Sequence, residues 1–502
     1  MDFVNNIYLA FQITLEPINL MLCFIGCLIG TFVGVLPGLG PAAAISLLLP
    51  LTFKLPPESA IIMLGGLYYG TMYGGSTTSI LINVPGEAAS VVTCLDGYQM
   101  AKKGKAGAAL GIAAFGSFIA GTIGTIMIML LAPPLAGIAL KFGPPEFVGL
   151  ISLGLIMVTY LSSGSMAKAL MMAIVGLLIS YIGTDVVTGM ERYTLGIDTI
   201  AGGFDIIPIV MGLFGISEVL INLERSPTER EVITTKFRKL LPTRQEWKDS
   251  AGPITRGSFL GFFLGLIPGG GGLIASFISY AVEKKIAKHP ETFGTGDIRG
   301  VAGPETANNA GAQGSFIPML TMGIPCNAVL AILMGALMVH GVTPGPRLLI
   351  DHPRIFWGVV GSMYIGNIML VILNLPLIGI WVRFLKIPYS ILFPFIFLFC
   401  LIGAYSVGNN VQDIYIMVLF GVLGYLMKKF DYEPAPLVLA FILGPMFENA
   451  FRQSLIISGG SILIFLNRPI AAAFLLLSLI LLISPLFLKI LGKRRLRLVV
   501  EE

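Results

Sequence analysis

The sequence predicts an all-α polytopic membrane protein with about 10–12 transmembrane helices, arranged as two inverted repeats that contain re-entrant hairpins and broken helices. Three observations support this. First, 55% of the 502 residues are hydrophobic and only 12% are charged, which is more apolar side chain than a soluble core can bury. Second, the long apolar runs lack the alternation of a barrel strand, so helices are expected. Third, a pair of helix-breaking motifs occurs twice.

The first of these motifs, called the tip motif, reads GVLPGLGP at residues 34–41 and GLIPGGGG at residues 265–272. Pro37 of the first copy corresponds to Pro268 of the second, 231 residues later. Proline removes a backbone donor and glycine leaves the chain uncovered, so a membrane helix is expected to stop at each copy. The basic residues that flank the second copy are too close together for two full crossings, which favours a re-entrant hairpin.

The second motif, called the break motif, reads GGSTTSILINVPG at residues 74–86 and QGSFIPMLTMGIPC at residues 313–326. Pro85 of the first copy corresponds to Pro325 of the second, 240 residues later, and the tip motif precedes the break motif in both halves. Two helix breaks in each half of a duplicated membrane chain are typical of secondary transporters, whose binding site lies near the membrane midplane.

A helix that ends inside the membrane exposes amide groups at one end and carbonyl groups at the other. Such ends suit an anion and a cation respectively, and nearby hydroxyl and amide side chains could complete the coordination of a carboxylate or of Na⁺. The candidate substrate- or ion-binding residues are Pro37, Gly38, Gly40, Pro41, Ser76, Thr77, Thr78, Ser79, Asn83, Pro85, Gly86, Gly269, Gly270, Gly271, Asn308, Asn309, Gly314, Ser315, Thr321, Gly323, Pro325 and Asn327.

The alternative is that these small residues and prolines only pack helices together. For the tip and break motifs we favour binding, because a packing glycine does not need a repeated Pro-Gly pair beside hydroxyl groups. Thr78 and Ser315 stay open between a direct ligand and a packing role.

Four acidic residues lie in or beside apolar sequence: Glu87, Glu218, Glu305 and Glu448. An ionisable group at membrane depth is a candidate proton or Na⁺ site. The alternative is a carboxylate at an interface or a helix end, and we favour it for Glu87 and Glu305. Asp96 is expected in a loop.

The division into halves follows the charge pattern. Residues 1–223 form a first membrane repeat, 224–253 a charged cytoplasmic linker, 254–492 a second membrane repeat and 493–502 a cytoplasmic tail. Lys102, Lys103 and Lys105 mark a cytoplasmic loop after the first break motif, whereas in the second half the basic flanks surround the tip motif. This exchange of positive charge between corresponding loops indicates that the two repeats have opposite orientations.

Several functions are excluded or disfavoured. Positive charges are concentrated in loops, so no nucleic-acid partner is expected. The PGGGG of the second tip motif lacks the ending of a phosphate-binding loop, and no other nucleotide motif is present. No catalytic arrangement of Ser, His or Asp is found, and five scattered cysteines with three histidines give no metal site, so we expect neither an enzyme nor a bound cofactor.

The tip and break motifs, together with GPETANNAGAQG at residues 303–314 and HGVTPGP at residues 340–346, resemble the large membrane subunit of tripartite tricarboxylate transporters, the TctA type. The resemblance covers most of the chain, from about residue 20 to residue 480. It implies a multi-pass importer in a bacterial inner membrane that takes up di- or tricarboxylates and is driven by a Na⁺ or H⁺ gradient.

The resemblance also implies partners and residue roles. Its partners would be a small four-helix membrane subunit, a periplasmic solute-binding protein, the carboxylate substrate and membrane lipid. Pro37, Gly38, Gly40 and Pro41 with residues 268–271 would form hairpin tips, and residues 76–85 with 315–327 would form broken helices. Alternating access would be of the elevator type. An anion-selective channel is the alternative function, since broken helices also line pores.

Overall fold

The computed structural model describes residues 3–36, 40–162, 165–185, 187–196, 200–224, 240–385 and 389–490. Most of the described residues are helical, and the described part contains one β-hairpin with two strands of two residues each. The all-α prediction is therefore confirmed. Pro37 and Gly38, two of the predicted tip residues, lie outside the described residues.

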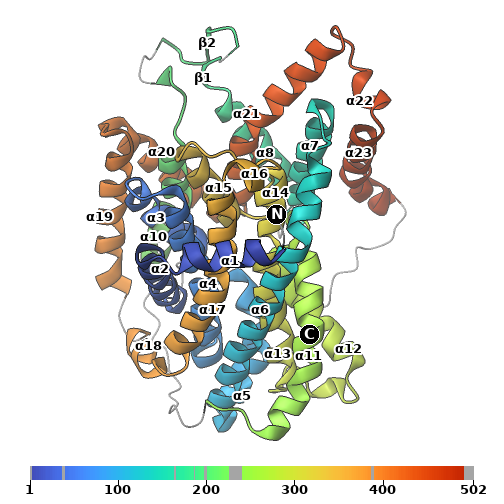
Figure 1. The fold of residues 1–502 in the computed structure, drawn as a ribbon. Coiled ribbons are helices and arrows are strands. Elements are labelled where there is room, and N and C mark those ends of the chain that lie inside the picture. Colours follow the sequence, from blue (N-terminus) through green and yellow to red (C-terminus); the bar gives the residue numbers. More distant parts are fainter. Residues whose placement is uncertain are drawn as a thin grey trace. The chain divides into compact units, whose positions relative to one another are not determined.

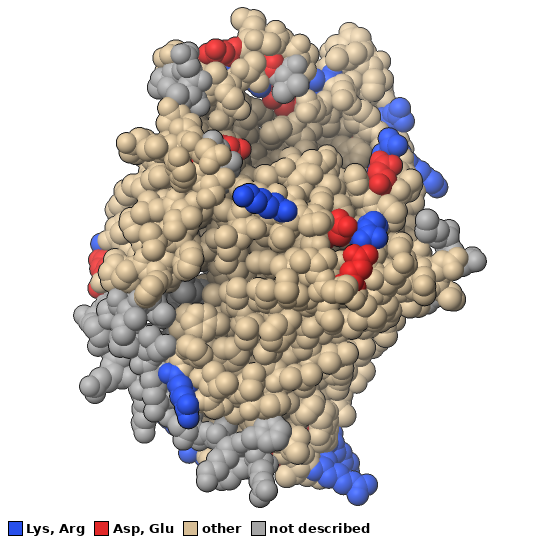
Figure 2. Space-filling view, turned by 60° about the vertical axis from the view of Figure 1, so that its left-hand side comes forward, with Lys and Arg blue, Asp and Glu red and all other residues tan. Residues whose placement is uncertain are grey.

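By length and composition, six helical stretches of the described residues can cross a membrane, so the chain is a polytopic membrane protein. They are Pro17–Val35, Ala88–Ala139, Ile206–Glu224, Pro353–Asn374, Val411–Lys429 and Pro434–Ile457. Six shorter apolar helices accompany them, and the expected total of about 10–12 crossings stays a prediction. Figure 2 shows a face that is mostly uncharged, with a few charged side chains, some of which lie side by side.

The chain forms two compact units, residues 1–139 with 204–430 and residues 140–203 with 431–502. The first part of unit 1 contains α1 (Phe3–Thr14), α2 (Pro17–Val35), α3 (Pro41–Leu48), η1 (Leu49–Thr52), α4 (Pro57–Ile82), η2 (Ala88–Ser90), α5 (Val91–Met100), the π-helix η3 (Ala101–Lys105) and α6 (Ala106–Ala139). Its second part begins with α9 (Ile206–Val210), the π-helix η5 (Met211–Ile216), α10 (Ser217–Glu224), α11 (Arg244–Gly265), α12 (Gly271–Ile286), η7 (Pro290–Thr292), α13 (Arg299–Gly314) and α14 (Phe316–Met322). It ends with α15 (Ala328–Val339), α16 (Leu348–Asp351), α17 (Pro353–Asn374), α18 (Ile378–Phe384), α19 (Tyr389–Gly408) and α20 (Val411–Lys429).

Two helices form the centre of unit 1. Every residue from Ser59 to Ile82 of α4 is buried, and so is every residue from Gly300 to Gly314 of α13. Helix α4 packs against α2, and α13 packs against α11 and α12; Figure 1 shows α11, α12 and α13 side by side. Because the buried stretch of α13 includes Glu305, Thr306, Asn308, Asn309 and Gln313, its burial requires hydrogen-bond partners for these side chains.

The same register of close backbone approach occurs twice. Glycines of the first helix in each pair face carbonyl oxygens of the second, at distances that leave no room for a side chain. In the first copy the approaches join Gly26 to Met63, Gly30 to Leu67 and Gly34 to Thr71; in the second they join Gly257 to Gly303, Gly261 to Ala307 and Gly265 to Gly311. Residues of α2 and α11 correspond at an interval of 231 and residues of α4 and α13 at 240, the intervals that separate the paired prolines. The duplication therefore extends to helix packing.

Unit 2 contains α7 (Pro144–Tyr160), α8 (Met166–Ser180), β1 (Gly183–Thr184), β2 (Glu191–Arg192), α21 (Pro434–Ile457), α22 (Ile464–Asn467) and α23 (Pro469–Ile490). Helix α21 packs against α7 and α8, and α23 packs against α7. The two strands pair antiparallel, with Gly183 opposite Arg192 and Thr184 opposite Glu191. Arg452 of α21 forms ion pairs with Asp185 and Glu448, which joins the hairpin to α21.

Asp96 does not lie in a loop, as we expected, but in α5. Its buried carboxylate accepts hydrogen bonds from the backbone amides of Gly294, Gly296 and Asp297 and from the hydroxyl of Tyr280. The polar side chain therefore receives its partners from a distant segment, the stretch between η7 and α13. In the linker region, α11 begins at Arg244, inside the stretch assigned to the charged linker.

Candidate functional site

Both break motifs adopt the same backbone course. Helix α4 ends at Ile82 and is followed by Asn83 in the left-handed conformation (φ 57°). Helix α14 ends at Met322 and is followed by Gly323, also left-handed (φ 72°). After the prolines, Glu87 and Asn327 are extended and precede η2 and α15. Each break is thus a helix end, a short extended passage and a new helix start, as a broken membrane helix requires.

Each break contacts the tip motif of its own copy. In the first copy, a Cβ atom added to Gly86 would lie 2.3 Å from the carbonyl oxygen of Gly34. In the second copy, the amide of Gly269 donates a 2.8 Å hydrogen bond to the carbonyl of Cys326. Convergence of the breaks from both halves on one pocket stays a prediction, and Pro37 and Gly38 lie outside the described residues.

The helices that start after the motifs meet across the two copies. Helix α3, which begins at Pro41 after Gly40 of the first tip motif, contacts α15, which follows the second break. Helix α12, which begins at Gly271 after the second tip motif, contacts η2, which follows the first break. At the start of α12, Gly271 and Gly272 lie against the side chains of Asn327 and Asn308. Asn327 caps α15, and Asn308 bonds to Glu87, which caps η2, so three helix starts lie near one another. Helix starts favour an anionic ligand.

Side chains connect the copies as well. Asn308 Nδ2 of α13 donates a 2.6 Å hydrogen bond to Glu87 Oε1, and Asn327 Nδ2 donates a 3.3 Å bond to the hydroxyl of Tyr68 on α4. Glu305 of α13 accepts hydrogen bonds from Ser76 of α4 and Thr93 of α5. Ser76, Asn308 and Asn327 of the predicted set therefore each take part in a contact between the two copies.

Glu87 and Glu305 are the two carboxyl groups of this region, with exposures of 8% and 1%. Neither forms an ion pair with a described Lys, Arg or His side chain. Glu87 caps η2, as the helix-end interpretation expected, but Glu305 lies inside α13 and is completely enclosed, so that interpretation was wrong for Glu305. A carboxylate buried without a basic partner requires a proton or a cation to balance its charge.

Four of the predicted hydroxyl residues already have hydrogen-bond partners within or between helices. Thr78 donates to the carbonyls of Gly34, Val35 and Gly74, and Ser315 donates to those of Gly265 and Gly311. Gly34 corresponds to Gly265, so the same carbonyl accepts a hydroxyl in each copy, although Thr78 and Ser315 are not equivalent residues. The remaining two bond nearby: Ser79 to Gly75 and Ser90, and Thr321 to Ile317.

The other predicted residues have mainly backbone roles. Gly269 and Gly271 have positive φ angles of 79° and 42°, so they supply turns that other residues adopt only with strain. Gly314 packs against the carbonyl of Phe262, and Gly270 lies close to that of Leu264. The side chain of Asn83 is exposed. Pro85 and Pro325 lie in the extended passages of the two breaks.

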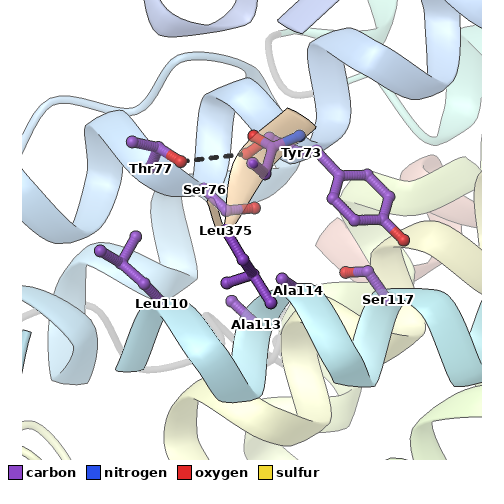
Figure 3. A pocket seen from close by; sticks show the side chains of 9 residues that line it. Tyr73, Ser76, Thr77, Leu110, Ala113, Ala114, Ser117 and Leu375 are labelled. Atoms are coloured by element: carbon purple, nitrogen blue, oxygen red, sulfur yellow. Dashed lines mark hydrogen bonds between the residues drawn. The ribbon is translucent and has the colours of Figure 1, made fainter. Parts of the chain in front are cut away.

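A small pocket lies in unit 1 beside Ser76, the hydrogen-bond partner of Glu305; its cavity volume of about 10 Å³ is room for one water molecule or one small ion. Its polar lining consists of Tyr73, Ser76 and Thr77 of α4, Ser117 of α6 and Asn374 of α17, and the remaining lining is apolar. Figure 3 shows the hydroxyl groups of Tyr73 and Ser117 on one side and Leu110, Ala113 and Ala114 along α6. Asn309 Nδ2 donates 2.7 Å to Ser117 Oγ, so another predicted residue borders this pocket.

The residues Tyr73, Thr93, Ser117 and Asn374 were not predicted. Ser117 is an isolated hydroxyl in an apolar helix, and Asn374 lies at the end of α17, far from either motif. Nothing in their local sequence distinguishes them from ordinary helix-packing residues. Of the other two intramembrane acids considered, Glu218 pairs with Lys428, and Glu448 pairs with Arg192 and Arg452, so both have basic partners.

Comparison with known proteins identifies relatives. Residues 20–439 match the family described as "Tripartite tricarboxylate transporter TctA family". The chain is 50% identical over 502 residues, the full length of both proteins, to an uncharacterized 52.8 kDa protein in the TAR-I ttuC' 3' region of Agrobacterium vitis. It is 52% identical over 234 residues to an uncharacterized protein in the TAR-II ttuC' 3' region of the same organism, covering 47% of this chain and 97% of that protein.

No solved structure matches the chain. The family match covers more than four fifths of the sequence and includes both copies of the tip and break motifs, whose contacts form the region described above. The chain therefore belongs to the tripartite tricarboxylate transporter TctA family, a family of transporters and not of enzymes.

Proposed function

We propose that this protein carries a di- or tricarboxylate, or a related organic acid, across a bacterial inner membrane as the large membrane subunit of a tripartite importer. Transport is driven by a Na⁺ or H⁺ gradient, and no other cofactor is needed. Family membership supports the transporter class. The observation that carries the proposal is that the start of α12 lies against Asn308 and Asn327, and that Asn308 also bonds to Glu87, which caps the helix after the first break.

The substrate site that we propose lies between these helix starts. Amide groups of the first turns bind the carboxylates, and no buried lysine or arginine is needed, because helix starts carry partial positive charge. Asn327, whose side chain accepts from the amide of Leu330, and Asn308 supply amide groups beside the helix starts. Glu87 and Glu305 carry the coupling proton or take part in binding the coupling cation, because each is buried without a described basic partner.

Alternating access is proposed to be of the elevator type, with two inverted repeats and re-entrant hairpins. The duplicated register of α2–α4 and α11–α13 supports two equivalent repeats. The contact between α11 and α12 on either side of the second tip motif supports a hairpin. The exchange of basic charge between corresponding loops supports opposite orientations, and the basic residues after α23 support a cytoplasmic C-terminus.

The partners that we propose are a small four-helix membrane subunit and a periplasmic binding protein that delivers the substrate. The tripartite nature of the family supports both. Lipid is the remaining partner: the outward-facing Leu419, Leu423 and Leu426 of α20 are exposed at helical spacing, as a lipid-facing stripe would be.

The test is reconstitution of the three subunits in vesicles, with radiolabelled carboxylates added together with the binding protein. We expect accumulation above equilibrium under an inward Na⁺ or H⁺ gradient and no accumulation when the gradient is collapsed. Asn327→Ala should reduce uptake, whereas Asn410→Ala, which removes an exposed cap of α20, should not. Flux that persists without any gradient and never accumulates substrate would refute the importer and establish the alternative, an anion-selective channel.

A further inference from the structure

One amide oxygen in the pocket beside Glu305 has no partner. Asn374 is 4% exposed, and its Nδ2 group donates to the carbonyl of Leu370 at 2.9 Å and to Thr31 Oγ1 at 3.5 Å. Its Oδ1 atom accepts no hydrogen bond from any described residue. Exchanging the two atoms would place Oδ1 against the carbonyl of Leu370, so the observed orientation is the favourable one. An acceptor therefore remains unsatisfied at the lining of the pocket.

The other polar groups of the pocket also offer oxygen atoms. Ser117 Oγ accepts from Asn309 and keeps a further lone pair. Thr77 Oγ1 has only a long bond of 3.5 Å, to the carbonyl of Tyr73, which Figure 3 shows as a dashed line. Ser76 Oγ borders the pocket and donates to Glu305. Hydroxyl and amide oxygens together with a nearby carboxylate are the donor set that a hard cation prefers.

The charge of the pocket decides between an anion and a cation. No Lys, Arg or His is among the lining residues, while the carboxyl group of Glu305 lies one hydrogen bond away, behind Ser76. A substrate carboxylate would approach the carboxyl group of Glu305 and the unpaired oxygen of Asn374 without any positive charge to offset them. A cation would satisfy both. The pocket is therefore unsuited to the substrate.

We infer that a monovalent cation, Na⁺, binds in the pocket between α4, α6 and the C-terminal end of α17, with Asn374 Oδ1 as a ligand and Glu305 as the balancing charge. This inference rests on the proposed function, because it assigns a place to the coupling ion. It separates the cation from the region between the helix starts, where the substrate is proposed to bind. Ser76 and Asn309 connect the pocket to Glu305 and to α13, so the ion would hold α4 and α13 together.

The experiment measures binding of ²²Na⁺ to the purified full-length chain, together with its thermal unfolding in NaCl and in choline chloride at equal ionic strength. We expect Na⁺ to raise the unfolding temperature of the wild type. Asn374→Ala should lower the apparent Na⁺ affinity about tenfold or more. Removing a residue that only orients a ligand already lowers metal affinity by at least about tenfold, and removing the ligand itself should lower it at least as much. Asn374→Asp should bind Na⁺ at least as well as the wild type, because it replaces an amide oxygen with a carboxylate.

A matched pair of serine variants keeps the test decisive if Asn374→Ala does not fold. Ser117→Ala should weaken Na⁺ binding, whereas Ser258→Ala on α11, whose hydroxyl bonds only to the carbonyl of Ile254, should leave it unchanged. Equal Na⁺ binding by the wild type, Asn374→Ala and Ser117→Ala would overturn the inference. So would a wild type that responds to NaCl no differently than to choline chloride, which would mean that the pocket holds only water.

Uptake assays separate this inference from the proposed function. Carboxylate accumulation driven by a proton gradient, without any Na⁺ binding, would overturn the cation site and leave the importer standing. Na⁺ binding that is lost in Asn374→Ala, in a chain that accumulates no carboxylate with its partners present, would support the site and refute the importer.

Discussion

The side-chain amide of Asn308 donates a 2.6 Å hydrogen bond to Glu87, and this bond joins the two copies of the repeat. Glu87 caps the helix that follows the first break, and Asn308 lies in the buried helix that precedes the second. Both side chains are almost completely buried, so water cannot easily take the place of a lost partner. Breaking the bond would therefore leave a buried polar group unsatisfied, which costs free energy of folding. The contact also joins two proposed roles: Glu87 is a candidate to carry the coupling charge, and Asn308 is a candidate substrate-binding residue.

The first prediction concerns this pair. Glu87→Ala and Asn308→Ala should each lower stability, and the double variant should lose about 1 kcal/mol less than the sum of the two, because the residues share one hydrogen bond. Thermal unfolding of the detergent-solubilised chain measures the three values. Glu87→Gln can still accept from Asn308, so it should unfold like the wild type while losing uptake. Additive single effects, or full uptake by Glu87→Gln, would contradict the roles given to the pair.

The sequence predicted the positions of the tip and break motifs because adjacent Pro and Gly residues favour a helix end, although single prolines such as Pro304 lie inside helices. The pairing of Pro37 with Pro268 and of Pro85 with Pro325 also gave the two intervals at which the helix contacts repeat. The partners of Glu305 could not be predicted, since Ser76 and Thr93 reach it only through the packing of α4 and α5 on α13. The sequence around each residue does not show which residues of two distant helices will lie opposite each other.

The hydroxyl residues show the same limit. Thr78 and Ser315 were left open between ligand and packing roles, and the structure gives both residues partners on the neighbouring helix. Ser76, two residues before Thr78, faces Glu305 instead. Consecutive residues of a helix point in different directions, so a run of hydroxyls contributes some side chains to a site and others to packing. Only the packing of α4 decides which.

The second prediction uses the duplicated backbone contacts. An added Cβ at Gly30 would lie 2.2 Å from the carbonyl of Leu67, and one at Gly261 would lie 2.3 Å from that of Ala307. Gly30→Ala and Gly261→Ala should therefore each cost about 1–3 kcal/mol through forced separation of the helices. Unfolding in detergent measures this cost. Gly137→Ala in α6, where an added Cβ meets nothing within 4 Å, is the control and should be neutral or slightly stabilising. Tolerance of alanine at either close contact would mean that the paired helices do not pack as described.

The third prediction is a pH dependence in unit 2. The hydrogen-bonded guanidinium of Arg452, followed by the backbone amide of Val187, holds the pKa of Asp185 below its usual value. A lowered folded-state pKa means that the pair stabilises the hairpin above the unfolded pKa of about 3.9 and that this contribution disappears as the pH falls through the lower folded value. Pepsin cleavage near β1 and β2 should therefore increase only below about pH 4.

Asp185→Asn is the test variant for this pair, because it keeps the shape of the side chain and removes its charge. It should make the hairpin equally susceptible to protease at every pH. Asp351→Asn, which removes an exposed pair with Arg347 in unit 1, is the control and should not change cleavage near the strands. Cleavage by pepsin that is the same at pH 5 and pH 2 in the wild type would show that the ion pair does not hold the hairpin.

The last prediction distinguishes a backbone role from a ligand role at Asn83. This residue was a candidate ligand, and the structure gives it an exposed side chain and a left-handed backbone, with a φ angle of 57° at the end of α4. Alanine in that conformation costs about 1–2 kcal/mol, whereas glycine adopts it freely, as Gly323 does at the corresponding point of the second copy. Asn83→Ala should therefore reduce stability and, through a displaced break, uptake, while Asn83→Gly should restore both. If Asn83→Gly folds like the wild type yet fails to transport, the amide of Asn83 contacts the solute and the backbone account is wrong; the comparison needs only unfolding curves and uptake rates for the two variants.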